Sequence, residues 1–256
     1  MKIFVAVKQV AAREARLRAN AAGTWIDETD LEYEINEADA YALEAALQLK
    51  EREGGEVTVV SAGPERVGRA IREALAKGAD RGIHIEADDP AGGDPLRTAW
   101  WLAQAAAAER PDLILTGLQS DDAGHGQTGV LLAELLGLPH ATLIVEIEKT
   151  DAGLRVRREL EAGRFQYLGL PLPAVLAVQS GISRLRYATL MGIKRAKTKP
   201  VSRLEASGWG PPPEPAFHLE RIYLPERRKR TEFLQGTAQE AAAQLVARLR
   251  GEARVL

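Results

Sequence analysis

The pattern of apolar and polar positions in the first half of the chain predicts strands alternating with helices. The strand candidates are short apolar runs rich in β-branched residues, at 2–7, 56–62, 82–86 and 113–116. The helix candidates are longer segments with apolar positions three and four residues apart, at 36–53, 64–77, 95–109 and 128–136. Strands alternating with helices of this length are typical of parallel βαβ units with right-handed crossovers.

The second half follows a different pattern. Two strand candidates, 142–148 and 154–160, flank a turn around Gly153, which predicts an antiparallel ribbon. Two more, 165–168 and 174–178, complete the predicted sheet.

Beyond Pro200 the sequence predicts irregular structure. The segment 208–213, with three consecutive prolines, is typical of a linker and not of a core element. An apolar stretch (217–224), a cationic run (226–230) and a terminal helix (237–249) follow it. Because this tail is too short to form a hydrophobic core of its own, we expect it to pack on a partner subunit. The predicted division is an α/β nucleotide-binding domain over 1–200 and a C-terminal arm and helix over 201–256.

Composition narrows the class of protein. The chain has 256 residues, of which 45% are hydrophobic and 27% charged, and its net charge of −2 argues against nucleic-acid binding. The absence of cysteine excludes disulfides and thiolate chemistry, and four histidines without ligand spacing predict no metal site. No apolar run reaches the length of a membrane span and no signal peptide is visible, so we expect a cytoplasmic protein without membrane insertion.

The segment between Gly117 and Gly129 carries the most functional information. A buried strand ends near Thr116, a loop of glycine and small polar residues follows, and an apolar helix begins near Thr128. Free N–H groups and the helix dipole favour a phosphate at such a helix start. No Lys or Arg lies between Gly117 and Gly137, so the sequence predicts a phosphate held by backbone and neutral side chains. This suits a tightly held nucleotide better than one whose γ-phosphate is transferred.

Several side chains of this loop allow more than one interpretation. The residues 124–129 spell G-x-G-x-x-G, but the run does not start at a strand end, which disfavours a dinucleotide site. Asp121 and Asp122 either bind a metal or ribose hydroxyls, or cap a turn in solvent. His125 is expected to be exposed and not catalytic. Gln127 and Thr128 stand where a helix N-cap belongs and are the side chains we first expect to bind a ligand.

Asn36 opens the predicted helix 36–53, and Asp39 follows three residues later in the pattern of a capping box. Both residues belong to the same rim of the predicted sheet as the glycine-rich loop. They either face the same ligand or serve only as caps.

A basic segment runs from Arg184 to Lys199 and contains the apolar pair Leu190 and Met191. Apolar side chains ringed by cations predict a small docking patch for an acidic partner. The alternatives are a solvated charged face, or a core-facing helix turn formed by Leu190 and Ile193.

Taken together, the sequence blocks resemble the beta subunit of electron transfer flavoproteins over residues 1–200. The matching blocks are VAVKQV (5–10), the helix end LKE (49–51), SAGPE (61–65), IREALAKGADRGIHI (71–85), GLQSDDAGHGQTG (117–129), LPAVLAV (172–178) and RYATLMGIKRAK (186–197). The family are heterodimeric electron carriers between dehydrogenases and a quinone reductase, without turnover chemistry of their own.

The resemblance implies a HUP-type adenine-nucleotide fold whose C-terminal arm embraces an alpha subunit. It implies AMP in this subunit as a structural nucleotide, with FAD held mainly by the alpha subunit. Its implied partners are the alpha subunit, acyl-CoA and other dehydrogenases, and a quinone oxidoreductase. Carried over by motif, the AMP site comprises Ala6, Asn36, Glu37, Ala38, Asp39, Ala62, Gly117, Leu118, Gln119, Ser120, Asp121, Asp122, Ala123, Gly124, His125, Gly126, Gln127 and Thr128. The recognition loop for partner dehydrogenases, with Leu190 as its anchor, comprises Arg186, Tyr187, Ala188, Thr189, Leu190, Met191, Lys194, Arg195 and Lys197.

Two departures from the family pattern bear on the site. Many relatives have Asn-Pro-Phe where this chain has Asn36-Glu37-Ala38, which puts a flavin contact from that position in doubt. Many have Asp and Asn where Gly124 and Gly126 stand, so backbone has to replace side-chain contacts there. Members that bind a second FAD in place of AMP usually end this loop in QVGP, whereas residues 127–130 read QTGV, which favours AMP. The alternatives are an FAD-binding, electron-bifurcating subunit and a stand-alone nucleotide-binding regulator like the universal stress proteins.

Overall fold

The computed structural model describes residues 1–87, 93–225 and 231–255. The chain divides into two units, Met1–Ile222 and Tyr223–Leu256. The first is an α/β unit that contains every strand described, and the second contains a single described helix.

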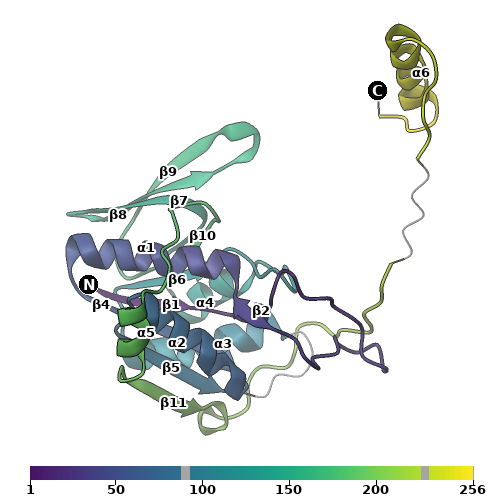
Figure 1. Ribbon diagram of the computed structural model, residues 1–256. Helices are drawn as coiled ribbons and strands as arrows, with labels where there is room; N and C mark the ends of the chain where they lie inside the picture. The colour runs from purple at the N-terminus through teal and green to yellow at the C-terminus, as the bar shows by residue number, and fades with distance from the viewer. Residues whose placement is uncertain (88–92, 226–230, 256) are drawn as a thin grey trace. The chain divides into compact units, whose positions relative to one another are not determined.

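The described part of the α/β unit forms a nine-stranded sheet in the order β11-β5-β4-β1-β6-β10-β7-β8-β9 (Figure 1). The strands from β11 to β7 in this order are parallel, and β8 and β9 continue β7 as an antiparallel ribbon. The bounds are β1 Lys2–Ala6, β4 Glu56–Gly63, β5 Arg81–Glu86, β6 Leu113–Gly117, β7 His140–Thr150, β8 Gly153–Glu159, β9 Phe165–Leu170, β10 Ala174–Val178 and β11 Val201–Glu205. A separate two-stranded ribbon pairs β2 (Gln9–Ala11) with β3 (Tyr33–Ile35).

Helices cover both faces of the sheet, because alternate side chains of each buried strand point to opposite faces. Ile3 and Val5 pack with α1 (Glu37–Glu53) and α2 (Gly68–Lys77), while Phe4 and Ala6 pack with α3 (Pro95–Glu109) and α4 (Thr128–Leu136). The short helix α5 (Leu190–Ala196) lies against α2. The described residues of the unit also contain three 3₁₀ turns: η1 (Glu65–Val67), η2 (Glu161–Gly163) and η3 (Ala206–Trp209).

The predicted fold class is confirmed: an α/β protein with a mainly parallel sheet, an antiparallel ribbon and a C-terminal helix. The predicted helix 64–77 is divided, because η1 precedes α2. The ribbon β2–β3 falls in segments for which the sequence predicted no regular element, and helix α5 corresponds to the helix turn that the sequence predicted only as an alternative at Leu190 and Ile193.

The prediction of irregular structure beyond Pro200 is wrong for the first residues. Strand β11 pairs in parallel with β5 along its whole length. Trp209, predicted to lie in a linker, packs edge to face on Trp100 with ring centroids 6.5 Å apart, beside the core that α3 and α4 share. Both segments find partners that are distant in the sequence, which local composition does not reveal.

The second unit contains α6 (Ala238–Gly251), close to the predicted bounds. Thr237 and Glu240 form a reciprocal capping box at its start, which defines the first turn. Of the 14 residues of α6, none is buried. The predicted cationic run 226–230 lies outside the described residues.

Candidate functional site

The main pocket opens where the order of strands reverses. From β1 the chain adds β4 and β5 on one side, then crosses to β6 on the other side of β1. Crossovers leave in opposite directions at such a point, so the carboxyl ends of the strands border a crevice. A cavity of about 660 Å³ lies there, bordered by the ends of β1, β4 and β6 and by the loop between β6 and α4.

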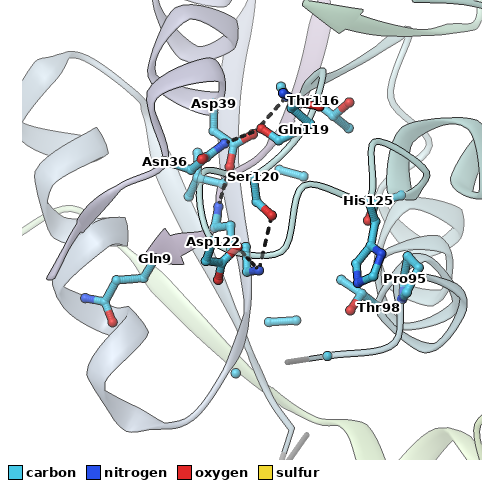
Figure 2. A pocket seen from close by; sticks show the side chains of 18 of the residues that line it. Gln9, Asn36, Asp39, Pro95, Thr98, Thr116, Gln119, Ser120, Asp122 and His125 are labelled. Carbon is cyan, nitrogen blue, oxygen red and sulfur yellow. Dashed lines mark hydrogen bonds and ion pairs between the residues drawn. The ribbon is translucent and has the colours of Figure 1, made fainter. Parts of the chain in front are cut away.

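Most residues predicted for the nucleotide site come together around this cavity. Those that line it are Ala6, Asn36, Asp39, Ala62, Gly117, Leu118, Gln119, Ser120, Asp122, His125, Gly126, Gln127 and Thr128. Those outside its lining are Glu37, Ala38, Asp121, Ala123 and Gly124. Figure 2 shows Asn36, Asp39, Ser120 and Asp122 on one side of the cavity, and His125 near Thr98 and Pro95 on the other.

Asn36 connects the start of α1 with the glycine-rich loop. Its Nδ2 donates to the carbonyl oxygen of Gln119 at 3.0 Å, and its Oδ1 accepts from the backbone N–H of Asp121 at 2.9 Å. The carboxylate of Asp121 in turn accepts from the backbone N–H of Glu37 at 3.2 Å. The predicted capping box is therefore wrong: Asn36 is the N-cap by position, but its side chain makes no capping hydrogen bond within the described chain. The loop caps the helix instead.

Asp39 holds the ends of two parallel strands together. Its carboxylate accepts from the backbone N–H of Lys8, just after β1, at 2.7 Å and from that of Gly117, at the end of β6, at 2.9 Å. Burial raises the pKa of Asp39 to about 6, although these backbone hydrogen bonds favour the charged form and oppose the rise. Asp39 therefore connects the ends of β1 and β6 at the rim of the pocket.

The cavity is lined by two cations that the glycine-rich loop itself lacks, Lys8 and Arg66. Lys8, from the strand end of β1, places its Nζ 2.7 Å from Asp122 Oδ1 and 3.5 Å from Ser120 Oγ. This ammonium lowers the pKa of Asp122, against the opposing effect of burial. Arg66 lines the same cavity and donates to the side-chain oxygen of Gln9 at 2.8 Å. The sequence of the loop alone could not predict either cation, because Lys8 follows β1 and Arg66 follows β4.

Small residues let the backbone segments of the rim approach closely. A Cβ on Gly117 would lie 2.7 Å from the backbone nitrogen of Asp39, so α1 can reach the end of β6 because residue 117 is glycine. At the start of α4, a Cβ on Gly129 would lie 2.6 Å from Thr116 Oγ1. That buried hydroxyl has no hydrogen-bond partner among the described residues. Gly129 therefore lets the start of α4 pack directly against the end of β6.

The sequence reasoning missed more than half of the cavity wall. The residues not foreseen are Val7, Lys8, Gln9, Trp25, Glu28, Gly63, Pro64, Arg66, Val67, Gly93, Pro95, Thr98, Trp101, Leu102, Thr116 and Gly129. The lining residues that directly follow β1 and β4 could have been predicted from the sequence, since the ends of parallel strands meet at one edge of a sheet. No sequence signal indicated Trp25, because it belongs to the long connection between β2 and β3.

The predicted docking segment is exposed and centred on α5. Tyr187 and Leu190 are 92% and 87% exposed, and Met191 is 58% exposed. Thr189 caps α5 by accepting from the backbone N–H of Gly192 at 3.0 Å. The alternative of a core-facing turn is wrong for Leu190, because the first turn of α5 points its apolar side chains outward.

Arg186, which belongs to the predicted docking segment, forms ion pairs with helix α1. Its guanidinium pairs with Glu44 at 2.8 Å and with Glu51 at 2.6 Å, both on α1. The two carboxylates raise the pKa of Arg186 and compensate its charge. Arg186 therefore anchors the segment to the sheet unit, while Lys194, Arg195 and Lys197 form no ion pair with the described residues.

One histidine lies in a polar cluster away from the cavity. Glu65, His84 and Glu86 bring ligand-type atoms within 4.8 Å of one another. The guanidinium of Arg203 bonds both carboxylates, at 2.6 and 2.9 Å. The carboxylates that could bind a metal ion there are therefore already paired with Arg203.

The fold and the cavity define an α/β protein with a nucleotide-sized pocket at the switch point of a parallel sheet. The family model described as electron transfer flavoprotein domain matches residues 23–208. The chain is 37% identical to the electron transfer flavoprotein subunit beta of Methylophilus methylotrophus, over 96% of this chain and 97% of the relative. It is 35% identical to that of Bradyrhizobium diazoefficiens and 33% identical to that of Bacillus subtilis, in each case over 100% of both chains.

The chain belongs to the electron transfer flavoprotein family, as a beta subunit. It is thus part of an electron carrier and not a catalytic enzyme, and a beta subunit implies an alpha-subunit partner. Among the described residues, no helix combines the length and the apolar character that crossing a membrane requires.

Proposed function

We propose that the cavity at the switch point binds AMP as a structural nucleotide, while the flavin of the heterodimer is FAD held mainly by the alpha subunit. The observation that carries this proposal is the position of the cavity, between the ends of three parallel strands and the start of α4. The N–H groups at this helix start and the ammonium of Lys8 suit a phosphate. The aromatic and apolar wall that contains Trp101 and Leu102 suits a base.

The proposal extends to the partners. The heterodimer carries electrons from acyl-CoA and other dehydrogenases, which dock on the segment around α5, to a quinone oxidoreductase. The exposure of Leu190 and Tyr187 supports docking there. The second unit is the arm that binds the alpha subunit, and its exposed Phe233, Leu245 and Val246 supply apolar surface for this contact.

The test is the nucleotide content of the purified heterodimer. The complex is denatured and its supernatant separated by chromatography; we expect about one AMP and one FAD per heterodimer. Gln127→Ala, at the start of α4, is expected to lower the AMP content. Glu134→Ala, exposed on the same helix, is the matched control and leaves it unchanged. Two FAD and no AMP would show a bifurcating subunit instead, and a beta subunit without any nucleotide would reject the site.

A further inference from the structure

Next to the exposed residues of α5 lies a groove between α5 and α2. Its volume is about 530 Å³, and it is lined by Arg72, Glu73, Ala76, Ala188, Ile193, Ala196 and Lys197. Three of these lining residues are alanines with short side chains, and Ile193 is 47% exposed. Figure 1 shows α5 beside α2 at the edge of the unit.

The two helices that form the groove are held firmly together. Arg72 of α2 donates to the carbonyl oxygens of Ala196 and Lys199, at 2.6 and 2.9 Å. Lys199, just after α5, donates to the carbonyl oxygens of Leu75 and Ala79, at 3.0 and 2.5 Å. Gly192 allows this approach, because a Cβ there would overlap the carbonyl oxygen of Ala76. The groove is therefore a preformed feature of the surface.

The charges around the groove are unequal. Glu73 pairs with Lys77 at 2.7 Å, so its charge is compensated within α2. The guanidinium of Arg72 donates to carbonyl oxygens, and neither Arg72 nor Lys197 forms an ion pair with the described residues. The rim thus keeps a positive charge next to apolar lining residues, which fits an apolar side chain carried on an acidic surface.

We propose that this groove receives an apolar side chain of leucine or phenylalanine size from the dehydrogenase docked on α5, next to a carboxylate of that partner. The inference rests on the proposed docking role of α5 and deepens it. Leu190 and Ile193 are three residues apart and therefore neighbours on the helix surface. The docking contact is then reciprocal: Leu190 enters the partner, and the partner enters the groove that Ile193 borders.

The experiment fills the groove after the protein has folded. The chain contains no cysteine, so Ala188→Cys places a single thiol of this subunit on the groove wall. The heterodimer with this variant is reduced by an acyl-CoA dehydrogenase before and after alkylation with N-ethylmaleimide. The quantity measured is the KM of the dehydrogenase for the heterodimer. Alkylation is expected to raise this KM about tenfold without changing the melting temperature. Ser202→Cys, on the exposed side of β11, is the matched control, and its alkylation leaves the KM unchanged.

An unchanged or lowered KM after alkylation of the Ala188→Cys variant would overturn the inference, because an empty groove tolerates added apolar volume. A Leu190→Ala variant measured in parallel separates this failure from failure of the docking role. If Leu190→Ala weakens transfer while alkylation does not, the docking role stands and the groove is not occupied. If alkylation weakens transfer while Leu190→Ala does not, the groove is the contact and Leu190 is not.

Discussion

Two buried polar side chains, Asn36 and Asp39, organise the rim of the cavity. Each connects α1 to a segment about 80 residues away, Asn36 to the glycine-rich loop and Asp39 to the end of β6. Such groups stabilise a structure only while their hydrogen bonds are satisfied, since an unsatisfied buried donor costs about 1–3 kcal/mol.

The raised pKa of Asp39 predicts a pH dependence of stability. The folded-state pKa is about 6, against ~3.9 in an unfolded chain, so between these values the folded state binds the extra proton. The free energy of unfolding should therefore fall by about 2–3 kcal/mol as pH rises from ~4 to ~6, and then level off. Urea unfolding of the wild-type chain and of Asp39→Asn tests this, because the variant lacks the titrating group. Parallel pH profiles for the two proteins would contradict the prediction.

Gly117 predicts a second effect at the same scale. In Gly117→Ala the new Cβ would meet the backbone of Ala38 and Asp39 at 2.7 Å, so the first turn of α1 has to move away from β6. We expect a loss of about 2 kcal/mol or more of stability, together with loss of the bound nucleotide. Gly169→Ala, whose Cβ meets nothing within 4 Å, is the control and should change stability by less than ~0.5 kcal/mol. Equal melting temperatures for the two variants would show that the rim is more plastic than this geometry implies.

At the scale of elements, α5 is unusual because its first turn exposes apolar side chains while its last residue is buried. Ala196 is 4% exposed, whereas Leu190 and Met191 face solvent. Arg186 before the helix and Arg72 beneath its end fix its position. A short helix held at both ends presents its apolar side chains without the entropy cost of ordering the backbone that carries them on binding.

Leu190→Ala should therefore weaken electron transfer from partner dehydrogenases without affecting the fold. Truncating a central apolar anchor typically costs on the order of 2 kcal/mol of binding, or ~30-fold in affinity. Because Leu190 is 87% exposed, the melting temperature and flavin content should stay unchanged. Reduction rates at varied dehydrogenase concentration measure the effect, and Leu135→Ala, 43% exposed on α4, is the matched control. A destabilised Leu190→Ala protein with unchanged transfer per folded molecule would reject the docking role.

At the scale of the whole molecule, the chain separates into a sheet unit with a continuous core and a unit that exposes its helix. The sheet unit extends to Ile222, where the backbone N–H donates to the carbonyl oxygen of Gly23 at 2.7 Å. Helix α6 has a defined start, and none of its residues is buried within the second unit, so apolar packing inside that unit contributes little to its stability.

Removal of residues 223–256 should consequently abolish heterodimer formation while the sheet unit stays folded. Circular dichroism and thermal melting of the truncated chain report the fold, and co-elution with the alpha subunit reports assembly. Thr237→Ala, which breaks the capping box, should weaken the complex partially, since a cap is worth ~1 kcal/mol of helix stability. Co-elution of the truncated chain at full affinity would show that the sheet unit alone binds the alpha subunit.

The sequence by itself determined the elements whose signal is local. Apolar runs bounded by Gly and Pro located the central strands, and helical periodicity located α1, α3 and α4. The glycine-rich loop between β6 and α4 located the carboxyl edge of the sheet as the candidate site, since this arrangement follows from chain order alone. Together with the matching sequence blocks, these signals were sufficient for the family.

The tertiary structure decided which side chains meet. Strand β11 and Trp209 find their partners across the unit, so composition after Pro200 could not reveal them. Asn36 and Asp39 carry the sequence signature of a cap, yet a residue's hydrogen bonds go to whichever donors the fold brings near, and here these are Asp121, Lys8 and Gly117. Lys8 supplies the loop with a cation for the same reason. Local patterns fix the elements, whereas the chemistry of the cavity depends on contacts between strand ends that are distant in sequence and adjacent only in the folded sheet.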